Sequence, residues 1–278
     1  MNFNTTHPPF GSPSPFVGTQ KRVSHAVFDF DGTLSWLRHG WPEMMLETFA
    51  PHLPAGQDMQ DPVIRERLLH LILALNGKPT IQQMAMFYEY ACSQGAKPPE
   101  PEPLRAAFQA CLDGHIQART ARISAGTVPV DAYVVAGARS LLEHLSRCGV
   151  RLYVLSSTIE HRVREEAALL GLSAYFEGRI FGSPADPTGY TKRAVFERIL
   201  REEGISGGQL LAIGDGPVEI TDAKALGGLA IAVCTDEAVN GSGISDPFKH
   251  QQLLAAGADL AIPDFKHAIP LLAPLLGR

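Results

Sequence analysis

The sequence predicts an α/β protein in which a parallel sheet carries helices on both faces and an all-helical domain is inserted into the chain. From about residue 130 onward, short apolar runs alternate with segments of helical spacing, the pattern of βαβ units and a parallel sheet. Another apolar run, at residues 25–30, comes much earlier in the chain. Between these two regions, residues 36–128 show helical spacing and few strand signals.

The predicted elements of the α/β region follow one another closely. The first strand, residues 25–30, has the sequence HAVFDF and ends next to acidic residues. The later elements are expected as helix 137–147, strand 150–156, helix 159–170, strand 177–181, helix 192–203, strand 209–213, helix 218–226, strand 229–234 and a strand near 259–262. In the insert, residues 68–75 and 81–92 are apolar enough for packed helices, whereas 94–103 is expected to be a loop because prolines disrupt a helix interior.

This order of elements predicts three parts of the chain. Residues 1–20 are rich in Pro, Ser, Thr and Gly and are expected to be a disordered leader. Residues 21–35 and 130–278 would form the α/β core, and residues 36–129 a helical cap domain. Because ligands of open α/β sheets bind at the carboxyl ends of strands, an insert that follows the first strand would lie over the ligand site.

Composition excludes several classes of partner. The 278 residues are 45% apolar and 19% charged, with a net charge of -5 and no long basic run, so no nucleic-acid binding is expected. No apolar run reaches the roughly 18 residues that span a bilayer, and the first twenty residues resemble no secretory signal. We therefore expect a cytoplasmic protein without membrane contact. The four cysteines form no CxxC pair and are expected to be buried, reduced thiols.

Acidic residues follow two of the predicted strands. Asp29 and Asp31 stand two residues apart before Gly32, and Asp215 follows the strand 209–213 between two glycines. Carboxylates are costly to bury without a cation or another partner. Oxygen ligands suit Mg2+, which usually takes one or two protein carboxylates. Each acidic segment, taken alone, is equally typical of an ordinary turn before a helix.

Two more polar residues occupy a strand end and a helix start. Ser156 closes the strand 150–156, where its hydroxyl and the following backbone N–H groups can bind a phosphate oxygen. Lys192 opens the helix 192–203, a position that the helix dipole disfavours for a lysine unless the side chain points at an anion. Taken alone, such a serine is more often a helix cap and such a lysine more often a solvated surface residue.

In their order and spacing, these features resemble the four motifs of the haloacid dehalogenase superfamily. The motifs are DFDGTL at 29–34, Ser156, Lys192 and GDGPVE at 214–219. The resemblance covers roughly residues 23–35 and 130–235. It implies a Rossmann-like core, and the insert is similar to the helical cap that such proteins carry after the first motif.

The resemblance implies a Mg2+-dependent phosphatase and assigns a role to each motif residue. Asp29 would be the nucleophile that forms an aspartyl-phosphate. Asp31 would be the general acid and base, and its backbone carbonyl would bind the metal together with Asp29 and Asp215. Ser156 and Lys192 would hold the oxygens of the transferring phosphoryl group.

Two further acids, and the identity of residue 31, refine this assignment. Glu219 stands where the family commonly has Asp, so we expect it to reach the outer shell of the metal. Asp222, one turn later, is expected either near the metal or facing solvent. Dehalogenases of the superfamily lack an acid at the position of Asp31, and its presence favours phosphate chemistry because an alkoxide leaving group needs a proton.

Candidate substrate contacts lie beside the first two motifs. Arg38, His39 and Trp41 directly follow the first motif, and Gly32 and Ser157 lie within or next to motifs. The arginine could bind an anionic group and the tryptophan could stack on a sugar or a base. Alternatively, the segment is a hinge with a packed tryptophan. The expected substrate is a small phosphorylated metabolite, such as a sugar phosphate or a nucleotide.

Other functions remain open at this point. A phosphomutase or a phosphonate hydrolase could share the core, but the latter needs a Schiff-base lysine in the cap. The cap has only Lys78, in a turn context, and Lys97, in the proline-rich segment. A non-enzymatic phosphate-binding or phosphoacceptor module could also use an acidic pocket with Mg2+, although receiver-type modules are shorter and have no helical insert.

Overall fold

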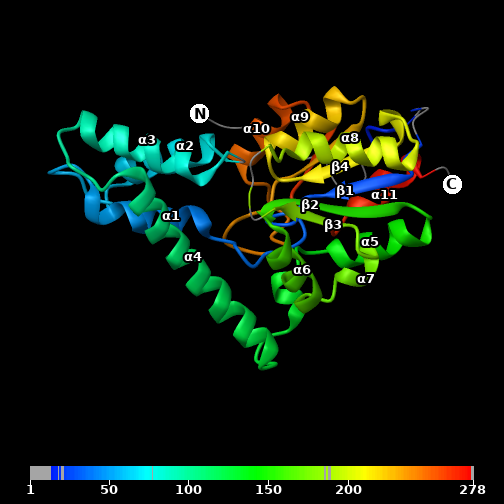
Figure 1. Ribbon diagram of the computed structural model, residues 1–278, viewed down its shortest axis with the longest axis horizontal. Coiled ribbons are helices and arrows are strands. Elements are labelled where there is room, and N and C mark those ends of the chain that lie inside the picture. The colour runs from blue at the N-terminus through cyan, green and yellow to red at the C-terminus, as the bar shows by residue number, and fades with distance from the viewer. Residues whose placement is uncertain are drawn as a thin grey trace. The chain divides into compact units, whose positions relative to one another are not determined.

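The computed structural model is described for most of the chain, and its contacts form two compact units (Figure 1). The described residues are 14–17, 19, 22–76, 78–184, 186 and 189–276. The first unit consists of Met1–Leu37 and Ile123–Arg278, and the second of Arg38–Arg122. Most of the predicted leader lies outside the described residues, but Phe16 is buried in the core of the first unit. That residues 36–129 act as a cap stays a prediction.

A parallel sheet of six strands forms the first unit, in the order β3-β2-β1-β4-β5-β6. The strands are β1 (His25–Phe28), β2 (Arg151–Ile159), β3 (Ile180–Ser183), β4 (Leu210–Gly214), β5 (Leu229–Val233) and β6 (Leu260–Ile262). The strand order reverses beside β1, which lies between β2 and β4. In open α/β sheets, ligands bind at the carboxyl ends of strands where the order reverses. The predicted Rossmann-like parallel sheet is confirmed.

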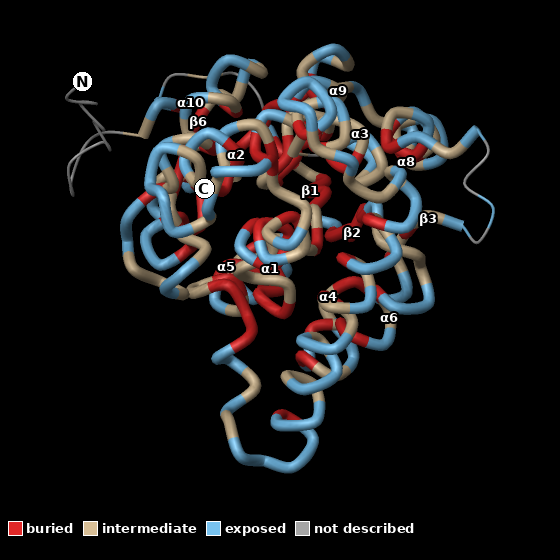
Figure 2. Tube along the Cα trace, turned by 90° about the vertical axis from the view of Figure 1, so that its left-hand side faces the viewer, coloured by how far each residue is buried: buried red, intermediate tan, exposed pale blue. Residues whose placement is uncertain are grey.

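Helices cover both faces of this sheet (Figure 1). One face carries α5 (Ala138–Arg147), α6 (Glu160–Leu169), α7 (Ser173–Phe176) and α11 (Ala268–Leu272), and the other carries α8 (Lys192–Glu203), α9 (Pro217–Ala225) and α10 (Pro247–Ala255). In β1, Ala26 and Phe28 join the apolar cluster of the first face, and Val27 joins that of the second. Successive side chains of a strand point to opposite faces, so a strand buried on both sides is apolar throughout. All four residues of β1 are buried (Figure 2).

The second unit has an apolar core of its own. Every regular element that the structure describes there is helical, as predicted. The elements are α1 (Trp41–Phe49), a short 3-10 helix at Ala50–His52, α2 (Pro62–Ala74), α3 (Thr80–Ser93) and most of α4 (Pro101–Ser124). At the centre of the core, the rings of Phe49 and Phe87 stack with centroids 4.0 Å apart.

Several predictions about local structure were wrong or incomplete. The segment 94–103 is not a loop throughout, since α4 begins at Pro101. Prolines are tolerated in the first turn of a helix because the N–H groups of that turn have no partner within the helix. Helix α10 was not predicted, although Asp246 caps it and Pro247 opens it. This pair of residues is a helix-start signal.

The four cysteines differ in how far they are buried. All four cysteines are free thiols, but only Cys234 is buried and Cys92 is exposed, so the expectation of buried thiols was wrong for most of them. Cys92 lies near the end of the amphipathic helix α3, away from its apolar face.

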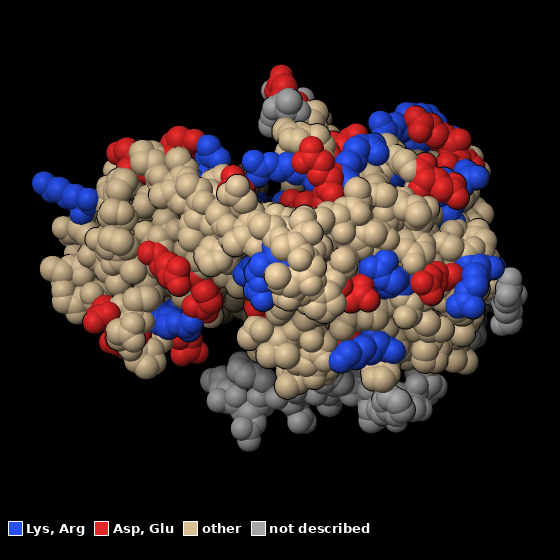
Figure 3. Space-filling view, turned by 90° about the horizontal axis from the view of Figure 1, so that it is seen from below, with Lys and Arg blue, Asp and Glu red and all other residues tan. Residues whose placement is uncertain are grey.

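Among the described residues, no helix has both the length and the apolar character needed to pass through a bilayer. On the described surface in Figure 3, basic and acidic side chains are interspersed rather than gathered into a basic stripe.

Candidate active site

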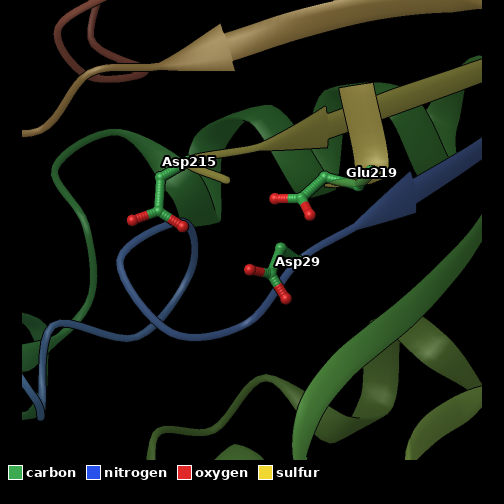
Figure 4. Close-up of side chains that lie close together, drawn as sticks. All are labelled: Asp29, Asp215 and Glu219. Atoms are coloured by element: carbon green, nitrogen blue, oxygen red, sulfur yellow. The ribbon is translucent and has the colours of Figure 1, made fainter. Parts of the chain in front are cut away.

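Three carboxylates meet where β1 and β4 end. Asp29 directly follows β1, Asp215 directly follows β4, and Glu219 lies in the first turn of α9. The two strands are parallel neighbours, and the Asp29 N–H donates to the Ile213 carbonyl at 2.8 Å. One carboxylate oxygen from each acid lies within 4.8 Å of the others, as Figure 4 shows for the three side chains.

The turn after Asp29 passes directly against Asp215. Gly32 has φ +73°, a backbone conformation that glycine adopts without strain. A β-carbon at Gly32 would also collide with the Asp215 carboxylate. Thr33 Oγ1 lies 3.5 Å from Asp215 Oδ1, at the limit of a hydrogen bond. Gly32 therefore lies against a carboxylate of the site, and any other residue would displace it.

Lys192 points into the carboxylates, not to solvent. Its side chain is 7% exposed, and Nζ lies 2.9 Å from Asp29 Oδ1 and 3.1 Å from Glu219 Oε2. Thr191 caps α8 by accepting a hydrogen bond from the Ala194 N–H at 3.1 Å, and this cap sets where the helix begins. Burial opposes the ammonium form, but Asp29 and Glu219 raise the pKa of Lys192 above its usual value. The lysine therefore stays charged.

Both carboxylate oxygens of Glu219 are engaged within the chain. Oε1 accepts from the Gly216 N–H at 2.8 Å, and Oε2 accepts from Lys192. The carboxylate also packs against Gly214, where a β-carbon would collide with it. Glu219 therefore connects the start of α9 with the end of β4 and orients Lys192. Asp222, on the same helix, is outside the three-carboxylate group, and burial is the main cause that raises its pKa.

Asp31 contacts hydroxyl groups at the end of β2. Its Oδ2 accepts from Thr158 Oγ1 at 2.7 Å and lies 3.4 Å from Ser156 Oγ. Ser156 is buried and accepts from the Thr158 N–H at 3.0 Å, whereas Ser157 is exposed. Sequence reasoning missed Thr158 because the strand was expected to end at 156. The run Ser-Ser-Thr at that end was the available signal.

A second lysine, Lys249, which sequence reasoning also missed, contacts Asp215. Lys249 Nζ lies 3.3 Å from Asp215 Oδ2 and 2.6 Å from Glu237 Oε1. Burial opposes the charge of Lys249, but Glu237 and Asp215 raise its pKa above the usual value. The sequence signal was the same as for Lys192, a lysine in the first turn of a helix, but helix α10 itself was not predicted.

The electrostatics of the site favour a divalent cation. Burial raises the pKa of Asp29 well above its usual value; Lys192 opposes this shift, while Glu219 and Asp215 add to it. Burial also raises the pKa of Asp215 to about 6, although Lys249 opposes that shift. The two lysines contact four carboxylates and offset only part of their negative charge. A divalent cation would balance the negative charge that remains. Grouped carboxylate oxygens are also the donors that Mg2+ prefers, so the residues present fit this ion.

The predicted substrate contacts near residue 40 belong to the second unit. Trp41 begins α1 and packs against the apolar cluster of that unit. The backbone carbonyl of His39 accepts from Arg119 Nη1 at 3.1 Å. Arg38 is the first residue of the unit and is half-buried. A substrate role for these residues stays a prediction.

Comparisons with known proteins bear on the family and the fold of the chain. The family model for haloacid dehalogenase-like hydrolases matches residues 23–227. Among solved structures, a haloacid dehalogenase-like protein from Agrobacterium tumefaciens is similar, with a TM-score of 0.63, 18% identity and coverage of 92% of this chain and 100% of that chain. A predicted phosphoglycolate phosphatase from Haemophilus somnus is similar with a TM-score of 0.59, 17% identity and coverage of 90% and 98%.

A third structure is a HAD family hydrolase from Deinococcus radiodurans with bound phosphate and sodium. Its TM-score is 0.56 at 16% identity, with coverage of 92% of this chain and 98% of that chain. A search among curated proteins gave no match. At these identities, the three structures bear on the fold alone.

Proposed function

Because the chain belongs to the haloacid dehalogenase-like hydrolase family, we propose that it is a Mg2+-dependent phosphatase that hydrolyses a small phosphorylated metabolite. One observation carries this proposal: the two acids of one turn have different partners. Asp29 is bound by the ammonium of Lys192, whereas Asp31 is bound by the hydroxyls of Thr158 and Ser156. Two carboxyl groups in different environments can take different roles in one reaction.

Asp29 is the nucleophile in this mechanism. Its carboxylate attacks the phosphorus atom, the bond to the leaving oxygen breaks, and an aspartyl-phosphate forms. Lys192 holds Asp29 and offsets the negative charge that gathers as a phosphoryl group approaches. Ser156 in β2 and the backbone N–H group of Ser157 are the proposed contacts for the phosphoryl oxygens. The Gly32 N–H donates to the Ser35 carbonyl at 2.9 Å and is already engaged within the chain.

Asp31 moves the protons. It donates a proton to the leaving alkoxide in the first step. In the second step it accepts a proton from the water that attacks the phosphorus, which releases inorganic phosphate and regenerates Asp29. The hydrogen bond from Thr158 orients Asp31 for both steps.

The proposed metal ligands are the carboxylates of Asp29 and Asp215 and the backbone carbonyl of Asp31. When bound, Mg2+ supplies positive charge that offsets repulsion between the phosphate and the carboxylates. Glu219 is assigned to the outer shell, because Gly216 and Lys192 already engage both of its oxygens.

Substrate choice is assigned to the helical insert, with Arg38, His39 and Trp41 as candidate contacts. A phosphonate hydrolase is less well supported, since Lys78 and Lys97 are both exposed and a Schiff-base lysine needs a desolvated site. A phosphomutase and a non-enzymatic phosphoacceptor module remain outcomes of the test below. The cytoplasmic location expected from the sequence also stays a prediction.

The test is a screen of phosphorylated metabolites for Mg2+-dependent release of inorganic phosphate. The Asp29→Asn variant serves as the blank, since the amide is nearly isosteric but is a poor nucleophile. We expect release by the wild type and none by a folded Asp29→Asn variant. Equal release by both proteins would show that Asp29 is not the nucleophile. Conversion of a substrate to an isomer without release of phosphate would identify a mutase instead.

A further inference from the structure

Lys249 is a buried lysine whose ammonium contacts three oxygen atoms. Its side chain is 1% exposed, and Nζ lies 2.6 Å from Glu237 Oε1, 3.1 Å from Thr235 Oγ1 and 3.3 Å from Asp215 Oδ2. An ammonium group is costly to bury unless all its donors are satisfied. The ammonium of Lys249 is therefore fixed in one orientation beside Asp215.

The position of Lys249 on α10 also points to a role at the site. The residue lies in the first turn of the helix, where its own N–H donates to the capping Asp246 Oδ1 at 2.8 Å. The helix dipole disfavours a cation at this end. The contacts with Asp215 and Glu237 compensate for that cost, and they turn the side chain toward the site.

These contacts act on one oxygen of the Asp215 carboxylate. Lys249 forms an ion pair with Oδ2, and Gly32 packs against the same oxygen so closely that a β-carbon there would collide with it. Thr235 Oγ1 accepts from Lys249 and donates to the Gly32 carbonyl at 3.1 Å, so one network holds both the lysine and the turn. The carboxylate of Asp215 is thus held on the side of Oδ2.

We propose that Lys249 is a positioning residue that makes Asp215 bind the metal through a single oxygen and thereby favours Mg2+ over Ca2+. This inference rests on the metal site of the proposed function. Mg2+ requires a near-octahedral shell with short bonds, whereas Ca2+ takes more ligands and often chelates both oxygens of a carboxylate. Because Oδ2 is held in an ion pair with an ammonium, chelation by both oxygens would have to disrupt that pair.

Glu237 explains how a lysine can stand so close to a cation site. Its carboxylate, 2.6 Å from Nζ, neutralises the charge of Lys249. The pair therefore orients Asp215 without adding a net positive charge that would repel the metal. The effect of Lys249 on the orientation of Asp215 can be separated by experiment from the effect of its charge, because Lys249 and Glu237 can be replaced singly or together.

The experiment measures Mg2+ and Ca2+ binding by calorimetry on the full chain, without substrate, at constant ionic strength. The double variant Lys249→Met/Glu237→Gln removes the ammonium and neutralises Glu237, so Asp215 is the one partner of Lys249 that keeps its carboxylate. We expect its ratio of Ca2+ Kd to Mg2+ Kd to fall about tenfold or more, mainly through tighter Ca2+ binding. Glu237→Gln alone should weaken both metals and leave the ratio nearly unchanged.

A matched control is the double variant Lys224→Met/Asp259→Asn, which removes another lysine–carboxylate pair, 2.6 Å apart and outside the three-carboxylate group. It should leave both Kd values unchanged. A folding defect would weaken both metals together and would not change their ratio.

An unchanged ratio in a folded Lys249→Met/Glu237→Gln variant, with normal Mg2+ binding by the wild type, would overturn the role of Lys249 alone. Absence of Mg2+ binding by the wild type would overturn the metal site, and this inference with it. If the double variant does not fold, Thr235→Val, which removes one acceptor of Lys249, must still lower the ratio by a smaller factor, and an unchanged ratio would again overturn the proposal.

Discussion

Lys192 Nζ lies 2.9 Å from Asp29 Oδ1, and the two side chains are 7% and 13% exposed. The two residues come from different layers of the fold, because Asp29 follows the central strand β1 and Lys192 opens helix α8. The same ammonium also contacts Glu219, at 3.1 Å. Lys192 is therefore the cation that makes two neighbouring buried carboxylates compatible with a folded chain.

Replacing Lys192 by Met should be costly for both stability and activity. Removal of one partner leaves Asp29 and Glu219 buried without their cation, which typically costs about 3–5 kcal/mol. Activity should fall by at least about a hundredfold. Urea unfolding at pH 7 and phosphate release check the two effects.

The stability loss should shrink as the pH is lowered. The pKa of Asp29 is higher in the folded chain than in the unfolded one, so protonation favours the folded state and removes the need for a counter-charge. Arg193→Met is the control. Arg193 pairs with Glu197 on the exposed side of α8, and its loss should cost less than about 1 kcal/mol. Similar losses for both variants would contradict a special role for Lys192.

Mg2+ binding should weaken as the pH falls through about 6, the pKa of Asp215 in the metal-free protein. A carboxyl with a raised pKa holds its proton more tightly, and the metal must displace that proton. We expect affinity at pH 5 to be about tenfold lower than at pH 7.5. Calorimetry at the two pH values measures this difference. The Asp222→Asn variant, in which the changed residue is outside the three-carboxylate group, should show the same difference in affinity. Equal affinity of the wild type at both pH values would contradict the prediction.

Thr158→Val should lower kcat by about tenfold and leave KM nearly unchanged. The variant keeps the shape of the side chain but removes the hydroxyl that donates to Asp31 Oδ2 at 2.7 Å. Thr158→Ser, which keeps a hydroxyl, should retain most of the activity. Steady-state kinetics on one substrate compare the three proteins. A kcat for Thr158→Val equal to that of the wild type would show that this hydrogen bond does not orient Asp31.

Arg38→Ala should lower kcat/KM for the physiological substrate by about ten- to a hundredfold, because a charge-assisted hydrogen bond to the substrate is lost. A small aryl phosphate, which has no remote group for Arg38 to bind, should be affected less. Arg65→Ala, which removes an exposed arginine paired with Glu43 in the same unit, should affect neither. Equal losses on both substrates would show that Arg38 is structural and that residues 35–41 form only a hinge.

Much of the site could be located from local sequence patterns. A short apolar run that ends in acid predicts a buried strand with a carboxylate at its end, and this places Asp29 and Asp215 without knowledge of the fold. A lysine at a helix start is unfavourable unless it meets an anion, which made Lys192 a candidate, and its place in the order of the four motifs singled it out. The structure brings these three residues together with Ser156, Asp31 and Glu219.

Other features were decided only by the tertiary structure. Thr158 reaches Asp31 because β2 lies beside β1 and runs past its predicted end, and Lys249 reaches Asp215 because α10 packs beside β5. Periodicity reports which face of an element is apolar, but it does not report which elements become neighbours. The sequence alone therefore determined the parallel α/β core, the helical insert and the acids at the strand ends. The partners that orient those acids depend on strand order and helix packing, which arise from contacts between residues far apart in the chain.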